Sequence, residues 1–213
     1  MIMSQKLFNS PLSQKIRQKA LSTIFVTGMA RGNLPLDQYR DFLVQDAVYF
    51  QSVAALYHNA EQAMLIQKNT EFAKFYSGQY TKFLKLHKDF VAEKKVKELQ
   101  KNEVSEALRE HMGFLSQVDP NNLAIAMLPC SMLYPELAKT KVQNPMDNVY
   151  EKDWFQENRR FDESSTEKFV NANFEVGEED RLTPVFLNAM LRELNFLREI
   201  GGEKPLSLQE LDV

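Results

Sequence analysis

The sequence predicts an all-α protein, and three observations support that prediction. Only seven glycines and eight prolines interrupt 213 residues, which suits long helices better than the frequent turns of a β-sandwich. Apolar residues recur at the spacing of a helix face through most of the chain. No segment alternates apolar and polar residues between hairpin turns, and no repeat occurs. We therefore expect a bundle of roughly seven or eight helices.

The length and composition predict a single domain over residues 1–213. Hydrophobic residues make up 44% of the chain, which is enough for one sizeable core. We expect about ten residues at each end to be peripheral, because chain termini carry few contacts.

The charge excludes several classes of partner. A net charge of −3 and a pI near 5.7 lack the cationic field that nucleic acids or anionic membranes require. No apolar run approaches the ~20 residues that span a bilayer, and the start MIMSQKLFNS does not resemble a secretory signal. The single cysteine cannot form an internal disulfide, which favours a reducing compartment. We therefore expect a cytoplasmic protein with no membrane or nucleic-acid partner.

Four helices are expected in the first half of the chain. Ser10 and Pro11 start the first, whose apolar positions continue to Phe25 and which ends at Gly28 and Gly32. Pro35 opens a long helix that runs to about residue 64. The other two are a helix capped at Asn69 and Thr70 and a helix over residues 104–118.

The next helix, which starts at Asp119 and Pro120, is expected to be central. Its stretch AIAMLPCSMLYPELA is apolar nearly all round, as in a buried helix. Within it, Cys130 lies between Pro129 and Pro135, and we expect Pro129 to kink the helix so that the thiol faces a cavity.

Three more segments complete the expected fold. They are a segment from Asn144 and Pro145 to Phe161, a helix capped by residues 164–166, and a last helix over residues 183–200 before Gly201 and Gly202.

The histidines do not form a recognisable metal motif. Di-iron bundles place a glutamate three residues before each histidine, but Ala55, Leu84 and Leu108 hold those positions before His58, His87 and His111. The first histidine also comes too late to be a haem ligand in the first helix. We expect no metal and no cofactor.

Several polar side chains fall on faces that should be buried. Asp46 has Tyr49 at i+3, Cys130 has Tyr134 at i+4, and Glu193 lies among apolar residues of the last helix. A buried carboxylate must be paired or hydrogen-bonded. On spacing alone, however, the cysteine and tyrosines could be core residues and Glu193 a solvated charge beside Arg192.

Four stretches resemble the TenA family, also called thiaminase II, in its cysteine-containing class. They occur in family order over roughly residues 15–200. The first two are the more specific. The stretches are FVTGMARGNLPLDQYRDFLVQDAVYF (25–50), LPCSMLYPE (128–136), YEKDWFQENRRFDE (150–163) and RELNFL (192–197).

The resemblance implies a haem-oxygenase-like helical bundle, a homotetramer and an aminopyrimidine hydrolase. The expected substrate is 4-amino-5-aminomethyl-2-methylpyrimidine, from degraded thiamin, or thiamin itself. Cys130 would be the nucleophile, Glu193 the acid and base, and Asp46 the group that binds the amino edge of the pyrimidine. The remaining lining residues would be Tyr49, Tyr134 and Tyr150.

This sequence departs from the family pattern at three places. The tyrosine expected before the cysteine is missing near Leu108 and Phe114, the run before Tyr150 is shortened over residues 144–149, and Leu197 replaces a tryptophan. These departures leave open a non-catalytic TenA-like protein that binds a small molecule and acts through partners. An oxidase on the same scaffold is disfavoured because metal ligands are lacking.

Overall fold

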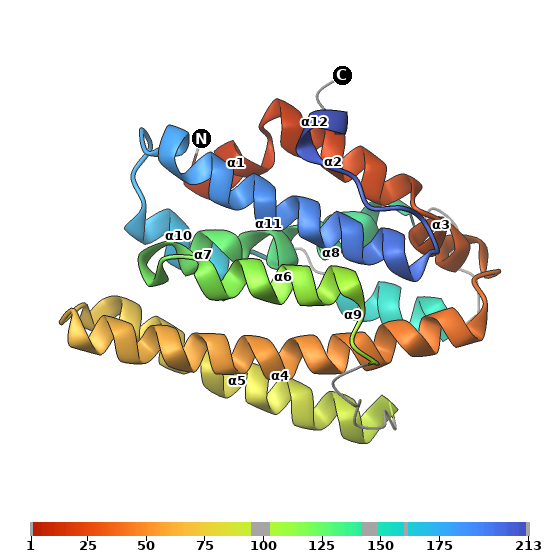
Figure 1. The fold of residues 1–213 in the computed structure, drawn as a ribbon, viewed down its shortest axis with the longest axis horizontal. Coiled ribbons are helices and arrows are strands. Elements are labelled where there is room, and N and C mark those ends of the chain that lie inside the picture. Colours follow the sequence, from red (N-terminus) through yellow and green to blue (C-terminus); the bar gives the residue numbers. More distant parts are fainter. Residues whose placement is uncertain (1, 95–102, 142–148, 160–161, 212–213) are drawn as a thin grey trace. The chain divides into compact units, whose positions relative to one another are not determined.

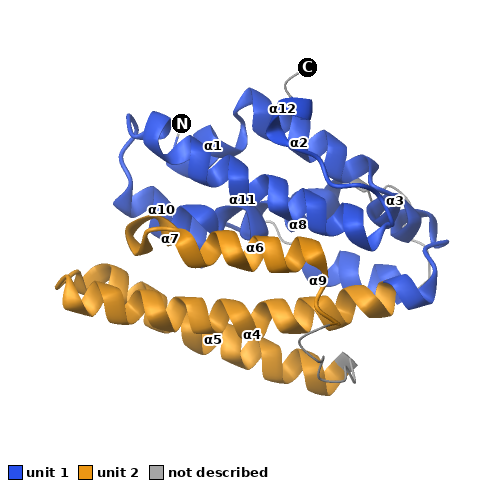
Figure 2. Ribbon diagram, in the orientation of Figure 1, with its two compact units in different colours: residues 1–38, 124–213 blue, residues 39–123 orange. Residues whose placement is uncertain are grey.

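The structure is a computed structural model that describes residues 2–94, 103–141, 149–159 and 162–211. Every regular element among these residues is helical (Figure 1), so the all-α prediction is confirmed. The chain divides into two compact units, residues 1–38 with 124–213 and residues 39–123 (Figure 2).

The first unit begins with three helices where the sequence predicted one. They are α1 (Met3–Phe8), α2 (Pro11–Ser22) and α3 (Ile24–Arg31). Pro11 opens α2 as predicted, but Thr23 has extended backbone angles and its hydroxyl accepts a hydrogen bond from Val26 N at 3.3 Å. The prediction of a single long helix is therefore wrong, because Thr23 ends one helix and caps the next. The amino-terminal segment expected at the periphery forms α1, which buries Met3 and Leu7.

A tight turn joins α3 to α4 (Leu36–Ile66). Gly32 adopts a left-handed conformation at the end of α3, with φ 71°, which favours glycine. A Cβ on Gly28 would lie 3.2 Å from the Cβ of Leu34, so the side chain of Leu34 packs where only glycine leaves room. The predicted start of the long helix after Pro35 is confirmed.

The second unit is built on α4, α5 and α6, with a short 3₁₀ turn before its end. Tyr57 packs its ring against Tyr76 and Phe83, at 5.8 and 5.5 Å between centroids. The Tyr76 hydroxyl donates to the carbonyl of Pro120 at 2.5 Å, which ties α5 to the 3₁₀ turn. The additional elements are α5 (Thr70–Lys94), α6 (Glu106–Gln117) and η2 (Pro120–Asn122).

The segment expected as one central helix is divided into η2, α7 (Leu123–Ala126) and α8 (Leu128–Lys141). The chain makes a turn at Met127, and Pro129 is the second residue of α8. The expected central helix is therefore interrupted just before Pro129, which has no backbone N–H to continue the helical hydrogen bonds, and the expected orientation of Cys130 toward a cavity stays a prediction. Pro135 is the proline inside α8.

Among its described residues, the rest of the first unit contains a π-helical turn, η3 (Glu151–Phe155), and four helices. The expected start at Asn144 and Pro145 lies outside the described residues. Ser164 caps α10 within the predicted range, and with Glu167 it forms a reciprocal capping box. The last long helix begins four residues before the predicted Thr183. The helices are α9 (Gln156–Asn158), α10 (Ser165–Asn173), α11 (Glu179–Ile200) and α12 (Leu208–Leu211).

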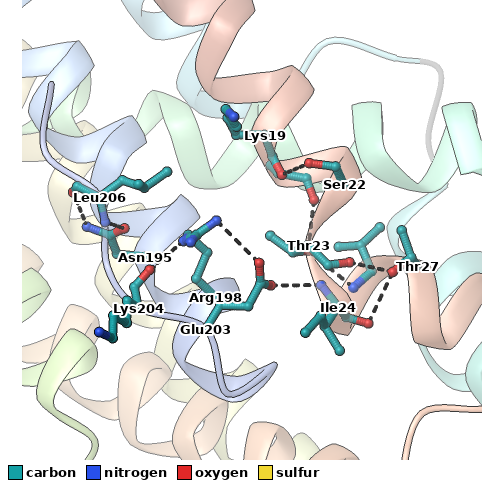
Figure 3. A network of polar contacts seen from close by, with 12 residues as sticks. Lys19, Ser22, Thr23, Ile24, Thr27, Asn195, Arg198, Glu203, Lys204 and Leu206 are labelled. Carbon is teal, nitrogen blue, oxygen red and sulfur yellow. Dashed lines mark hydrogen bonds and ion pairs between the residues drawn. The ribbon is translucent and has the colours of Figure 1, made fainter. Parts of the chain in front are cut away.

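Polar contacts fasten the end of α11 to the start of α3 within this unit (Figure 3). Glu203 accepts a hydrogen bond from Ile24 N at 2.7 Å and pairs with Arg198 at 3.3 Å. Asn195 exchanges two hydrogen bonds with the backbone of Leu206, at 2.9 and 2.8 Å. These contacts hold the carboxy-terminal segment against the helices of the unit. In the same unit α11 also packs against α2 and α8.

Candidate functional site

A partly buried hydrogen bond joins α8 and α11 in the first unit. The Tyr134 hydroxyl donates to Oε2 of Glu193 at 3.0 Å, and Glu193 is only 3% exposed. A carboxylate removed from water is costly unless a donor satisfies it, and the tyrosine supplies one. Two residues that the sequence proposed for the site are therefore in direct contact.

Cys130 lies one helical turn before Tyr134. Residues at i and i+4 share a helix face, so the thiol and the tyrosine ring lie on the same side of α8. The cysteine is partly exposed, unlike Pro129 before it, which is buried. A partly exposed thiol can meet a substrate, which a fully buried one cannot.

Trp154 lies against Tyr134 in the same unit. Their ring centroids are 6.0 Å apart with the planes at 60°, and Trp154 is 2% exposed. The residue comes from the π-helical turn η3, and such turns often occur at functional sites. Sequence reasoning recognised it only as part of a motif. Its being the one tryptophan of the chain was a signal that could have drawn attention to it.

The hydroxyl of Tyr150 is bonded to the backbone. It donates to the carbonyl oxygen of Leu34, at the turn before α4. Burial of the ring raises the pKa of the Tyr150 hydroxyl, because the ionised form loses its solvation. Tyr150 is therefore engaged with the turn between α3 and α4, and its predicted contact with a substrate stays a prediction.

Asp46 and Tyr49 lie on α4 within the second unit. Tyr49 is 6% exposed and its ring lies 5.7 Å from that of His111, which is itself buried. Asp46 is partly exposed one turn earlier. Leu108, near the place of the missing family tyrosine, is buried on α6. The joining of these side chains with Cys130 and Glu193 in one site stays a prediction.

His111 is a buried polar residue whose burial the sequence analysis did not predict. The missing glutamate three residues before it argues against a metal ligand and carries no information about a ring contact. Its position four residues before Leu115 on an apolar helix face was the signal that it would be buried.

The described residues contain no group of three or more histidine, cysteine, aspartate or glutamate side chains that could hold a metal ion. Within the same part of the chain, none of the helices is both long and apolar enough to cross a membrane.

Residues 14–200 match the model of the TENA/THI-4/PQQC family. The chain belongs to this family. The match covers most of the sequence and confirms the resemblance carried by the four stretches. One curated relative of TenA type is the aminopyrimidine aminohydrolase of Bacillus subtilis (strain 168), which is 27% identical over 168 residues. The alignment covers 68% of this chain and 71% of the relative.

Solved structures of TenA proteins share the fold. The TenA homologue protein from P. horikoshii OT3 has a TM-score of 0.70 at 18% identity, covering 95% of this chain and 99% of that one. A TenA family transcription regulator from Silicibacter sp. TM1040 has a TM-score of 0.73 at 16% identity, covering 93% and 96%. The fold is therefore the helical, haem-oxygenase-like fold of TenA proteins.

Proposed function

We propose that this TenA family member is a hydrolase of the thiaminase II type. Its substrate would be 4-amino-5-aminomethyl-2-methylpyrimidine or thiamin, in thiamin salvage. The observation that carries the proposal is the partly buried hydrogen bond between Tyr134 and Glu193, one helical turn from Cys130. The relatedness to an aminopyrimidine aminohydrolase supports the choice of substrate class.

The proposed reaction exchanges the group on the exocyclic methylene for water. Glu193 in its protonated form donates to a ring nitrogen, and the Cys130 thiolate then adds to the electrophilic ring. The C–N bond to the leaving amine breaks, water adds at the methylene, and the thiolate leaves the ring. The net change replaces one C–N bond by a C–O bond and releases ammonia, or the thiazole when thiamin is the substrate.

The other predicted residues would bind and orient the ring. Asp46 accepts from the exocyclic amino group, since an ionised carboxylate has only acceptors to offer. Tyr49, Tyr134 and Tyr150 present flat faces on which a pyrimidine can stack. Tyr134 has a second role, because its hydroxyl donates to the proposed acid and base.

Replacing Cys130 by serine tests the nucleophile. We expect Cys130→Ser to lower kcat by at least about a hundredfold, since serine without an adjacent base is a far poorer nucleophile than a thiolate. The melting temperature and the affinity for the pyrimidine should stay close to wild type. The measurements are ammonia release, calorimetric ligand titration and thermal melting. A Cys130→Ser protein that keeps most of its turnover per folded molecule would rule out the covalent mechanism.

Asp46→Asn is the complementary variant. The amide can accept at only one of its two polar atoms, so the affinity for the aminopyrimidine should fall by roughly tenfold or more while folding is kept. Cys130→Ser serves as its control, because that variant should lose turnover and keep binding. Unchanged affinity in Asp46→Asn would remove Asp46 from the substrate site.

The alternative is a non-catalytic TenA-like protein that binds a small molecule and acts through partners. Leu108 favours it, because an apolar side chain stands near the place of a family tyrosine. Purified protein that binds the pyrimidine but releases neither ammonia nor thiazole would support this alternative.

We also propose a cytoplasmic homotetramer. A reducing compartment would keep the proposed Cys130 nucleophile as a thiol. Sedimentation velocity measures the assembly directly, and a stable monomer at micromolar concentration would contradict the tetramer.

A further inference from the structure

We propose that Trp154 is a positioning residue that holds the Tyr134 ring where its hydroxyl can donate to Glu193. The inference rests on the proposed function, because it assigns a role to Trp154 within the same site. It concerns a side chain that acts through another residue and need not touch the substrate.

The contact between the two rings is the first step. Tyr134 is only partly buried, so α8 alone does not confine its ring. Trp154 is almost fully buried and packs at 6.0 Å with the ring planes inclined at 60°, an arrangement that aromatic pairs favour. A tyrosine hydroxyl moves with its ring, so fixing the ring fixes the direction of the O–H donor toward Glu193.

The turn that carries Trp154 is itself held at several points. Glu151 pairs with Arg159 at 3.0 Å, and only 8% of the Glu151 side chain is exposed. Asn158 donates to the Trp154 carbonyl at 2.9 Å, and Phe155 packs edge-on against the indole at 5.0 Å. These contacts restrict the position of the indole, so it can support the Tyr134 ring from one side.

The π-helical turn accounts for the direction of the Trp154 indole toward Tyr134. A π turn contains one residue more than an α turn, so it changes the direction in which the following side chains point. Its first neighbour, Tyr150, is bonded to the Leu34 carbonyl, which fixes the start of the turn. The turn is thus anchored on both sides of Trp154.

We expect the position of the Tyr134 ring to affect the rate of the chemical step. A displacement of about 1 Å in a group that supports the reacting atoms can lower the rate by about a hundredfold. Removing the indole should let the Tyr134 ring move and lose its aim at Glu193, which lowers kcat more than it raises KM.

A double-mutant cycle tests whether Trp154 acts through the Tyr134 hydroxyl. We expect Trp154→Leu to lower kcat by about tenfold or more, and Trp154→Phe, which keeps a ring, to retain most of it. In the Tyr134→Phe background, Trp154→Leu should lower kcat by less than about twofold, because the hydroxyl is already absent. Equal losses in the two backgrounds would overturn the proposal.

Phe8→Leu is the matched control. Phe8 is a buried aromatic residue of the same unit, and its ring packs under the Arg17 guanidinium at 4.3 Å, away from the contacts that fix the indole. It should lower the melting temperature while kcat per folded molecule stays within about twofold of wild type. A loss of kcat equal to that of Trp154→Leu would show a general packing effect and overturn the positioning role.

Urea unfolding separates this inference from the proposed function. The four proteins compared are those of the double-mutant cycle: wild type, Trp154→Leu, Tyr134→Phe and the double variant. If Trp154 aims the hydroxyl, Tyr134→Phe should raise the unfolding equilibrium constant about fivefold more in the wild-type background than in the Trp154→Leu background. That coupling is measurable even if the wild-type protein releases no ammonia, an outcome that would refute only the hydrolase. Additive changes in the unfolding constant would refute the positioning role.

Discussion

At the scale of single residues, Tyr150 makes a contact that the sequence did not predict. Its role as a pocket-lining residue stays a prediction, and its hydroxyl donates to the Leu34 carbonyl, 116 residues away in the chain. A motif identifies the side chain but carries no information about a backbone acceptor so distant in sequence. The predicted acid and base Glu193, by contrast, contacts Tyr134, which the same resemblance had placed in the site.

Tyr150→Phe should destabilise the protein in a pH-dependent way. Near pH 7 the variant leaves a buried carbonyl without its donor, so the free energy of unfolding should fall by about 1–2 kcal/mol. Burial raises the pKa of the native Tyr150 hydroxyl above that of the unfolded chain, near ~10. The native state therefore holds this proton more tightly, and the stability due to Tyr150 is present below pH ~10 and lost as the pH rises further.

Urea unfolding of both proteins between pH 7 and pH 11 measures this effect. The difference in the free energy of unfolding between wild type and Tyr150→Phe should shrink above pH ~10. The other tyrosines titrate in both proteins, so the difference isolates Tyr150. A difference that stays constant to pH 11 would contradict the assigned cause.

At the scale of elements, helix starts were predictable where a cap is written in the sequence. Pro11 and the Ser164–Glu167 capping box mark their helices correctly. The break at Thr23 was missed, because apolar periodicity continues across it and does not reveal a local change in backbone angles. The π turn at Glu151–Phe155 likewise has no sequence signature.

The packing of α11 against α3 leads to a prediction at Gly201. A Cβ there would lie 3.0 Å from the backbone nitrogen of Phe25 and 3.2 Å from Oε2 of Glu203, the carboxylate that bonds Ile24 N. Since a backbone atom cannot move away as a flexible side chain can, Gly201→Ala should lower the free energy of unfolding by about 1–3 kcal/mol.

Gly113→Ala provides the comparison for that variant. Gly113 lies in α6, is exposed, and has nothing within 4 Å of an added Cβ. Alanine should raise the free energy of unfolding there by up to ~1 kcal/mol, because it favours the helix. Chemical denaturation of both variants measures the change in the free energy of unfolding, which should be negative for Gly201→Ala and positive for Gly113→Ala. A stabilised Gly201→Ala would contradict the close approach of α11 and α3.

At the scale of the whole molecule, the chain forms two compact units, and the single domain expected from the sequence stays a prediction. Both crossings between them fall inside helices: residues 38 and 39 lie within α4, and residues 123 and 124 within α7. Independent domains are usually joined by exposed linkers in which few contacts cross. An insertion bounded by helices at both ends was not predictable, because composition does not change at either crossing.

Because helices continue through both crossings, we expect the two units to unfold as one. Unfolding either unit alone would require breaking a helix at each crossing, which opposes independent transitions. Differential scanning calorimetry should give a single transition whose calorimetric and van't Hoff enthalpies agree.

If the proposed tetramer forms, Tm should also rise with protein concentration, since assembly stabilises only the folded chain. Gly201→Ala and Gly113→Ala, which lie in different units, should each shift the whole transition; a variant that moves only part of the heat absorption would show that the units unfold separately.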